Sequence, residues 1–460
     1  MNNLDVEKSS FRDPSGFLFY QGDVLYRQVN KSYKENYEFF FESGLYEELL
    51  NKKIIVSHKK AEIENKDNKA FITIKPEIIP FISYPYEWSF SQLKDAALLT
   101  IEIQKIAKKH KMILKDASSY NIQFKNGKPI FIDTLSFEKY VEGEPWKAYK
   151  QFCQHFLAPL ALMSHKDIRL SQLLRIYIDG IPLDLASKLL PISTKADFSL
   201  LTHIHAHAKS QKHFESKKMN VKRKISSRSF DGIIESLHTA IKKMSWKPEG
   251  SEWGEYYSDT NYSNISFNEK KKIITEFLHE YNPTNVWDLG SNTGVFSRIA
   301  SELNIFTVSF DIDPVAVEKN YRESLKKQET NILPLLLDLA NPSSSIGWSN
   351  NERKSFMNRG SADAAMALAL IHHLVISNNI PLSKLAKFFS EICKFLVIEF
   401  IPKTDSQISR LLVTREDIFH EYTQENFEIE FKKIFKINKK IEILDTERII
   451  YIMEKVENAV

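Results

Sequence analysis

Acidic, glycine and asparagine residues alternate at the end of one apolar segment in the second half of the chain. In "VWDLGSNTGVFSRIA", Asp288, Gly290, Asn292 and Gly294 follow a strand-like run and precede a helix-like run. A sharp strand-to-helix turn that approaches a ligand closely needs positive φ, which glycine adopts freely and asparagine tolerates. The spacing is not the G-x-G-x-x-G of dinucleotide sites. The turn therefore predicts a ligand-binding loop and disfavours a nicotinamide-dependent oxidoreductase.

Two further carboxylates and a histidine pair follow in the same half. Asp311 lies in "VSFDID", about one strand and helix after the turn, and Asp338 ends "LLLD". A carboxylate at the end of a second strand can accept both hydroxyls of a ribose, as in Rossmann folds. His372 and His373 close "ADAAMALALIHHL", and His372 is the candidate general base because imidazole titrates near neutrality. In the alternative interpretation, the carboxylates cap helices. One histidine ring then caps a turn, and the other packs against its neighbours.

This ordered set, from Ser251 to Lys455, resembles the class I S-adenosylmethionine (SAM) dependent methyltransferases. The resemblance implies that Asp288, Gly290, Asn292 and Gly294 form the SAM-binding turn. It also implies that Asp311 binds the ribose hydroxyls and that Asp338 accepts from the adenine amino group. The half has a looser likeness to bacterial methyltransferases of the nodulation-protein type, which names no acceptor.

An aromatic stretch precedes this half. "WGEYYSDTNYS" contains Trp253, Tyr256, Tyr257 and Tyr262. These rings can form a lid over a cofactor or pack in the core, and the sequence favours neither.

The first half contains a second set of chemically capable residues in "MILKDASSYNIQFKNGKPIFIDTLSF". Asn121 is the fifth residue after Asp116, and Asp133 ends a later apolar strand. This spacing resembles the catalytic loop and metal-binding strand of protein-kinase-like enzymes, including aminoglycoside and sugar kinases. The resemblance implies that Asp116 orients an acceptor hydroxyl while Asn121 and Asp133 hold magnesium on ATP. The alternative is a turn that Asp116 caps and Asn121 closes.

The first half also departs from the kinase pattern. Leu114 and Lys115 stand where protein kinases have His-Arg, Thr134-Leu135 stand where they have Phe-Gly, and no glycine-rich loop is present. Arg27, with Glu35 or Glu38, is a candidate for the ion pair of an active kinase. An active kinase and a degenerate one both remain open.

The patterns of apolar residues predict the elements that position these sets. "GFLFY" and "VLYRQV" flank Gly22 as a hairpin, and "SQLKDAALLTIEIQKIAKKH" is an amphipathic helix. After Asn268, helices and strands alternate, which is typical of a parallel sheet. We expect an α/β protein in which a C-terminal Rossmann-like sheet carries helices on both faces and an N-terminal α+β domain is kinase-like. The expected bounds are 1–200 and 251–460, joined by a basic helical connector over 201–250.

Composition limits the remaining functions. The 460 residues suffice for two domains, and a net charge of +4 gives no reason to expect nucleic acid. Cys153 and Cys393 make neither a disulfide framework nor a metal motif. The motif "HIHAH" (203–207) lacks a fourth ligand nearby, which favours packing over metal binding. No apolar run is long enough to cross a bilayer, so we expect a cytoplasmic protein. Nothing indicates the oligomeric state.

The expected function is transfer of a methyl group from SAM to an unidentified small-molecule or saccharide acceptor. One alternative is a bifunctional kinase and methyltransferase that makes a methyl phosphate on a saccharide. In that case the chain also binds Mg-ATP, and the pairing of domains is similar to that of enzymes that cap bacterial O-antigen. The other alternative is a binding protein in which a pseudokinase controls the second domain.

Overall fold

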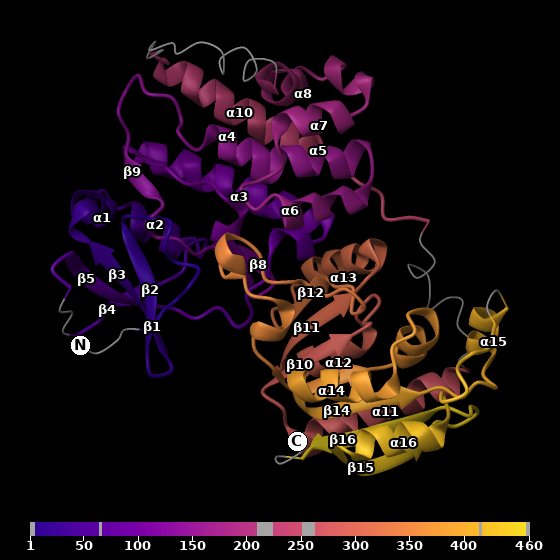
Figure 1. Ribbon diagram of the computed structural model, residues 1–460. Helices are drawn as coiled ribbons and strands as arrows, with labels where there is room; N and C mark the ends of the chain where they lie inside the picture. Colours follow the sequence, from indigo (N-terminus) through magenta and orange to yellow (C-terminus); the bar gives the residue numbers. More distant parts are fainter. Residues whose placement is uncertain (1–4, 64–66, 209–223, 251–262, 414–415, 457–460) are drawn as a thin grey trace. The chain divides into compact units, whose positions relative to one another are not determined.

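The chain forms two compact units. The computed structural model describes residues 5–63, 67–208, 224–250, 263–413 and 416–456 (Figure 1). The first unit comprises Met1–Lys247 and Ser345–Arg353, and the second comprises Pro248–Ser344 and Lys354–Val460. No helix within the described ranges is both long and apolar enough to span a membrane.

The first unit contains a five-stranded antiparallel sheet with strand order β1-β2-β3-β5-β4. These strands are β1 (Asp5–Val6), β2 (Gly16–Gln21), β3 (Val24–Asn30), β4 (His58–Lys60) and β5 (Ala70–Pro76). Two short ladders follow, one of β6 (Met112–Leu114) with β9 (Phe137–Lys139), the other of β7 (Ile122–Lys125) with β8 (Lys128–Phe131). The hairpin predicted around Gly22 is confirmed, because Gln21 pairs with Val24 and Gly22 has a φ of 59°.

Helices make up the rest of the first unit. They are α1 (Lys34–Glu42), α2 (Leu45–Asn51), α3 (Phe90–Lys109), α4 (Tyr149–Phe152), α5 (Ala158–His165), α6 (Leu173–Ile176), α7 (Leu183–Leu189), α8 (Phe198–Leu200) and α10 (Ser227–Lys243). The predicted amphipathic helix is α3, which starts at a capping box of Ser89 and Gln92. Gly44, with a φ of 77°, separates α1 from α2.

The connector expected over 201–250 does not stand apart as a separate segment. Its described part up to Lys247 belongs to the first unit. α10 buries Phe230, Ile234, Leu237 and Ile241 on one face. It packs on α3, where the Lys108 ammonium lies 4.9 Å from the Phe230 ring and Lys94 donates to the carbonyl of Met244, just after α10. The lysine-rich stretch that suggested a linker or exposed helix lies almost entirely outside the described residues, whereas the apolar stripe of α10 docks the segment after it on α3.

A seven-stranded sheet forms the second unit, with strand order β12-β11-β10-β13-β14-β16-β15. The strands are β10 (Asn285–Leu289), β11 (Phe306–Asp311), β12 (Ile332–Leu336), β13 (Ala362–Ala367), β14 (Cys393–Phe400), β15 (Phe435–Glu442) and β16 (Ile449–Lys455). The ladders that join β10 through β14 are parallel, and β16 runs antiparallel to both of its neighbours. The predicted parallel sheet is therefore confirmed, with two antiparallel strands added at one edge.

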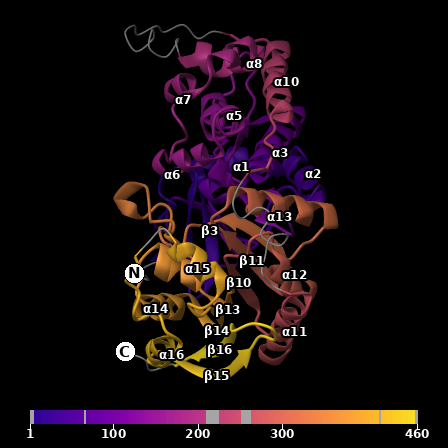
Figure 2. The ribbon, with the colours of Figure 1, turned by 90° about the vertical axis from the view of Figure 1, so that its right-hand side faces the viewer.

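Helices cover both faces of this sheet. They are α11 (Asn264–Tyr281), α12 (Val295–Glu302), α13 (Pro314–Lys327), α14 (Leu382–Ile392), α15 (Ser406–Leu412) and α16 (Gln424–Lys432). Figure 2 shows α11, α12 and α13 on one face and α14 and α16 on the other. Residues of α11 and α12 such as Ile274, Phe277 and Phe296 share a core with Val286 and Met366 of the sheet. The expected Rossmann-like layering is thus present.

The strand order reverses direction between β10 and β13. The chain moves outward from β10 through β11 to β12, then returns to the other side of β10 with β13. In open parallel sheets, a crevice forms at such a switch point outside the carboxyl ends of the strands. Asp288 and Asp311 lie at those ends, so the fold brings these sequence-predicted residues to the place where ligands bind in other sheets of this kind.

Candidate functional site

The turn after β10 has the left-handed backbone that its sequence predicts. The φ angles are 75° at Gly290, 51° at Asn292 and 79° at Gly294. A Cβ on Gly290 would lie 3.1 Å from Leu370 Cδ1, so glycine permits the close approach of the loop after β13. A Cβ on Gly294 would lie 2.5 Å from Asn320 Oδ1. Gly294 therefore serves the packing of the turn on α13, while Gly290 and Asn292 line a cavity.

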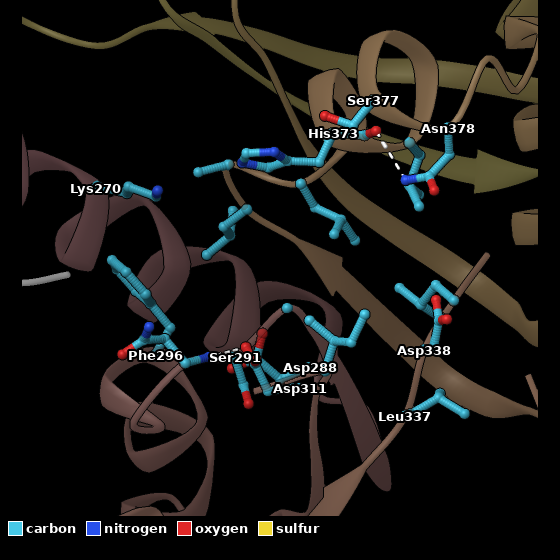
Figure 3. A pocket seen from close by; sticks show the side chains of 18 of the residues that line it. Lys270, Asp288, Ser291, Phe296, Asp311, Leu337, Asp338, His373, Ser377 and Asn378 are labelled. Atoms are coloured by element: carbon cyan, nitrogen blue, oxygen red, sulfur yellow. Dashed lines mark hydrogen bonds between the residues drawn. The ribbon is translucent and has the colours of Figure 1, made fainter. Parts of the chain in front are cut away.

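This cavity has a volume of about 300 Å³ and lies at the switch point of the sheet. Its walls come from α11, the turn after β10, the end of β11 and the loops after β12 and β13 (Figure 3). The lining residues with charged or polar side chains are Lys270, Asp288, Ser291, Asn292, Asp311, Asp338, His373, Ser377 and Asn378. Most of the remaining wall is apolar and includes Phe267, Phe296 and Leu368.

Two carboxylates in the cavity wall are held by hydrogen bonds, one from the turn and one from α12. The Asp311 carboxylate accepts hydrogen bonds from the backbone N–H groups of Asn292 and Asp313, at 2.7 and 2.8 Å. The Asp288 carboxylate accepts from the Ser297 hydroxyl. Burial raises the pKa of Asp288 to about 7, with a contribution from the charge of Asp311, and burial raises the pKa of Asp311 to about 6. A ligand that brings hydrogen-bond donors or a positive charge would stabilise both ionised carboxylates.

A buried hydroxyl in the same turn has no hydrogen-bond partner among the described residues. Ser291 Oγ is inaccessible to solvent, and Ser291 lines the cavity. Buried polar groups are nearly always paired, so an orphan beside a cavity indicates a ligand atom that pairs with it. Asp338 also lines the cavity, and its carboxylate accepts from the N–H of Ala340 at 2.9 Å.

The two histidines after β13 occupy different places. His373 lines the cavity, whereas His372 is buried and is not part of the wall. Their ring centroids lie 4.0 Å apart, and within the described ranges His372 Nδ1 is buried and has no hydrogen-bond partner. Burial lowers the pKa of His373 to about 4, and burial lowers that of His372 further, helped by the charges of His373 and Arg448. His373, and not the predicted candidate base His372, therefore contributes the imidazole that lines this cavity.

The acidic set of the first unit also comes together. Asp116 follows β6 and hydrogen-bonds with the side chains of Gln151 and Asn121, while burial and the charge of Asp133 raise its pKa. Asn121 donates to the Ser136 hydroxyl at 3.2 Å, which in turn donates to Asp133 at 2.7 Å.

Arg27 on β3 is the partner of Asp133. The guanidinium lies 2.6 Å from Asp133 Oδ1, and the N–H of Leu135 donates to the same oxygen. Burial acts to raise the pKa of Asp133, but the charge of Arg27 and these hydrogen bonds outweigh it and lower the pKa. Neither Glu35 nor Glu38 pairs with Arg27, since each has a lysine neighbour instead. Arg27 therefore forms its ion pair with Asp133, the candidate metal ligand, and not with a glutamate of α1.

The remaining candidates from the sequence are the histidines of the motif at 203–207 and the aromatic stretch with Trp253. His203 bonds the hydroxyls of Tyr149 and Ser236, and His205 bonds those of Ser187 and Thr194. The two rings therefore serve separate hydrogen-bond sets. The aromatic stretch with Trp253, Tyr256, Tyr257 and Tyr262 lies outside the described residues.

The chain resembles a curated protein over nearly its whole length. It is 34% identical over 460 residues to the nodulation protein NoeA of Rhizobium meliloti (strain 1021), covering 97% of this chain and 96% of that one. The chain belongs to the NoeA family of nodulation proteins. The likeness to nodulation-type proteins drawn from the sequence is confirmed. No protein-family profile matches the chain.

Solved structures that are similar to this chain include methyltransferases. The magnesium protoporphyrin IX methyltransferase of Synechocystis PCC 6803 with bound SAH has a TM-score of 0.31 and 14% identity, over 44% of this chain and 91% of that one. The N-methyltransferase NodS of Bradyrhizobium japonicum WM9 has a TM-score of 0.31 and 12% identity, over 42% and 99%. WbdD, described as a bifunctional kinase-methyltransferase, has a TM-score of 0.32 and 14% identity, over 45% and 44%. The ligands that these proteins bind and the acceptors that they methylate are not assigned to this chain on the basis of this similarity.

The sequence motifs did not identify three of the residues that line the cavity. Lys270 and Ser291 line the cavity, and so does His373, which the sequence offered only as the neighbour of the candidate base. Ser291 could have been found from its place between Gly290 and Asn292. Lys270 stands among three consecutive lysines of α11, and no local pattern distinguishes it from Lys271 and Lys272.

Proposed function

We propose that the protein is a SAM-dependent methyltransferase that acts on a small molecule and that the second unit carries the reaction. The observation that supports this most is the pair of buried carboxylates, Asp288 and Asp311, beside an unpaired buried hydroxyl, Ser291 Oγ, at the switch point of the sheet. A nucleoside that carries an amino acid through a sulfonium, as SAM does, offers the hydroxyls, amino group and positive charge with which these groups would pair.

The residues present fit SAM in order along the cavity. Asp311 accepts from the ribose hydroxyls, as the family resemblance implies, because its carboxylate is fixed by two backbone N–H groups. Asp338 lies beyond it and accepts from the adenine amino group. Gly290 lets the backbone approach the ligand, and Ser291 donates to it. When bound, SAM supplies a methyl group on a positively charged sulfur, which is already a strong electrophile.

The protein's contribution to methyl transfer is then mainly positional. The apolar wall around Phe296 and Leu368 excludes water from the sulfonium. His373 is neutral at pH 7, because its pKa is about 4, and it can accept a hydrogen bond from an acceptor hydroxyl or amine. His372 contacts the His373 ring and acts through it as a positioning residue. Ser377 and Asn378 add polar groups that suit an acceptor with hydroxyls, including a saccharide.

The test is label transfer from methyl-labelled SAM to a small-molecule extract of cells that lack the gene, in the cytoplasmic fraction where we expect the protein. The proposal expects labelled product with the wild type and none above background with Asp311→Ala. Binding of SAM without label transfer to any fraction of the extract would instead support a binding protein.

The second candidate function concerns the first unit. The order of its strands and helices, with Asp116 after β6, Asn121 just before β7 and Asp133 after β8, supports a kinase-like fold. The Arg27–Asp133 ion pair favours the pseudokinase alternative, because it occupies an oxygen that magnesium would need.

Thermal unfolding with millimolar Mg-ATP separates the two alternatives for this unit. A pseudokinase leaves the midpoint unchanged. A rise that disappears in an Asn121→Ala, Asp133→Ala double variant would instead support the bifunctional enzyme, because a ligand that binds only the folded state stabilises it by mass action.

A further inference from the structure

Two cations of the first unit contact the same carboxylate, that of Asp13 in the loop before β2. The Lys115 ammonium lies 3.4 Å from Asp13 Oδ1, and Arg27 Nη2 lies 3.9 Å from Asp13 Oδ2. The Asp13 side chain is 29% exposed and that of Arg27 is 11% exposed, so the carboxylate is the more accessible member of this pair. Two cations that meet at one accessible carboxylate form a place where negative charge is stabilised.

The contacts of these cations with Asp13 are longer than their other polar contacts. Arg27 Nη1 lies 2.6 Å from Asp133 Oδ1, and Lys115 Nζ lies 2.6 Å from Ser15 Oγ. Arg27 Nε is buried and has no hydrogen-bond partner within the described part of the chain. At 3.9 Å, Arg27 Nη2 does not donate to Asp13 either. Asp13 is thus attracted by charge, while donors of Arg27 remain available for an anion that approaches more closely.

The loop that carries Asp13 is attached to the unit by polar contacts. None of residues 11–14 is buried. Arg12 donates to the carboxylate of Glu352 at 2.8 and 3.0 Å, and the next residue along the chain is Asp13 with its two long ion pairs. Segments that bury little apolar surface open at a low cost in free energy. Asp13 can therefore leave the two cations while the core of the unit stays folded.

The acidic residues nearby favour an anion here over a divalent cation. Both oxygens of Asp133 already accept hydrogen bonds, Oδ1 from Arg27 and the N–H of Leu135, and Oδ2 from the Ser136 hydroxyl. Magnesium needs carboxylate oxygens that are open to it. Arg27 instead supplies a permanent positive charge at this place, because a guanidinium does not lose its proton in proteins.

We propose that Arg27 and Lys115 form a binding site for phosphate groups and that Asp13 occupies this site when the ligand is absent. A phosphate group has three strongly accepting oxygens, so it can bond Arg27 Nε, Arg27 Nη2 and Lys115 together. Its binding displaces Asp13, releases residues 11–14 and requires no magnesium. This inference concerns the first unit alone and holds whether or not the second unit binds SAM. Free polyphosphate and the phosphate chain of a nucleotide share this chemistry, and the experiment separates them.

The experiment titrates the full chain by calorimetry, in the presence of EDTA, with inorganic tripolyphosphate and with ATP. Asp13→Asn removes the charge but keeps an oxygen that can accept from the N–H of Ser15, as Asp13 does at 2.9 Å. We expect Asp13→Asn to bind tripolyphosphate at least about tenfold more tightly than the wild type, because the ligand no longer competes with a carboxylate.

Two further variants assign this gain in affinity. Asp23→Asn is the matched control, because Asp23 is exposed in the turn between β2 and β3 of the same unit. It removes the same charge, and it should bind tripolyphosphate as the wild type does. Lys115→Met in the Asp13→Asn background should abolish the gain, because the anion then loses one of its two cations.

The outcomes decide both the inference and the source of the phosphate groups. Tighter binding of ATP than of tripolyphosphate by Asp13→Asn supports a nucleotide site, and equal binding supports a site for the phosphate chain alone. Equal affinity of the wild type and Asp13→Asn, or no binding by either, overturns the inference. An equal gain in Asp23→Asn, or a gain that survives Lys115→Met, overturns it too, because net charge then explains the effect. A gain that appears only when magnesium replaces EDTA overturns it in favour of a metal site.

Discussion

The backbone N–H of Asn292 donates a hydrogen bond of 2.7 Å to the carboxylate of Asp311. This bond joins the turn after β10 to the end of β11 and forms with Asn292 at a φ of 51°. Left-handed backbone is costly for most residues other than glycine, asparagine and aspartate. The residue that replaces the middle glycine of the turn therefore fixes the orientation of the carboxylate that we assign to the ribose.

Substitutions of Asn292 test this relationship. Asn292→Gly should change the affinity for S-adenosylhomocysteine by less than about threefold, because glycine adopts the same φ and retains the N–H. Asn292→Val should lower stability by about 2 kcal/mol and weaken binding about tenfold or more, because a β-branched residue strains this backbone. Calorimetry and urea unfolding measure both. If valine behaves like glycine, the turn does not have the conformation described.

The raised pKa of Asp288 gives a pH dependence of stability in the ligand-free protein. Burial raises this pKa from 3.8 to about 7, so the folded chain binds the proton more tightly than the unfolded chain. The resulting stabilisation is complete below pH about 4 and is lost as the pH rises through about 7. In Asp288→Asn this loss is absent. The difference in melting temperature, variant minus wild type, should therefore increase between pH 5 and pH 8.

Differential scanning fluorimetry over that range measures the difference. A constant difference between wild type and Asp288→Asn would mean that Asp288 titrates normally. An excess of S-adenosylhomocysteine should reduce the pH dependence of the wild type, since the ammonium of this ligand favours the ionised carboxylate.

The Arg27–Asp133 pair predicts a stability effect in the first unit. Its side chains are 11% and 17% exposed, so Arg27→Met leaves a largely buried carboxylate without its cation. We expect the free energy of unfolding to fall by about 2 to 3 kcal/mol. This is at the low end for buried pairs, because both side chains keep some exposure to solvent. Lys34→Met, which breaks the exposed pair of Lys34 with Glu38, should cost less than about 0.5 kcal/mol. Similar losses in the two variants would show that the Arg27 pair is not buried in solution.

The parts of the site that the sequence predicted are those determined by local chain geometry. A turn that needs positive φ accepts few residue types, so Gly290 and Asn292 marked it directly. Parallel strands of similar length place their carboxyl ends at one edge, so Asp311 was placed once the alternation of strands and helices was recognised.

The parts of the site that the sequence did not predict depend on contacts between distant segments of the chain. Lys270 is paired with Glu399, which is 129 residues away, and its neighbours Lys271 and Lys272 have the same side chain. His372 and His373 are adjacent, and only the helical turn after β13 decides which ring enters the wall. The segment Ser345–Arg353 belongs to the first unit because Glu352 accepts two hydrogen bonds from Arg12, which no motif indicates.

If the second unit holds SAM at the turn after β10, a calorimetric titration of the full chain with SAM will show it. We predict one site per chain in the wild type and an affinity at least about tenfold weaker in Asp311→Ala. Asp363→Ala is the matched control, since its carboxylate bonds Thr284 and is not part of the cavity wall, and it should bind as the wild type does. No binding by the wild type, or equal binding by Asp311→Ala, would mean that SAM does not bind at this turn.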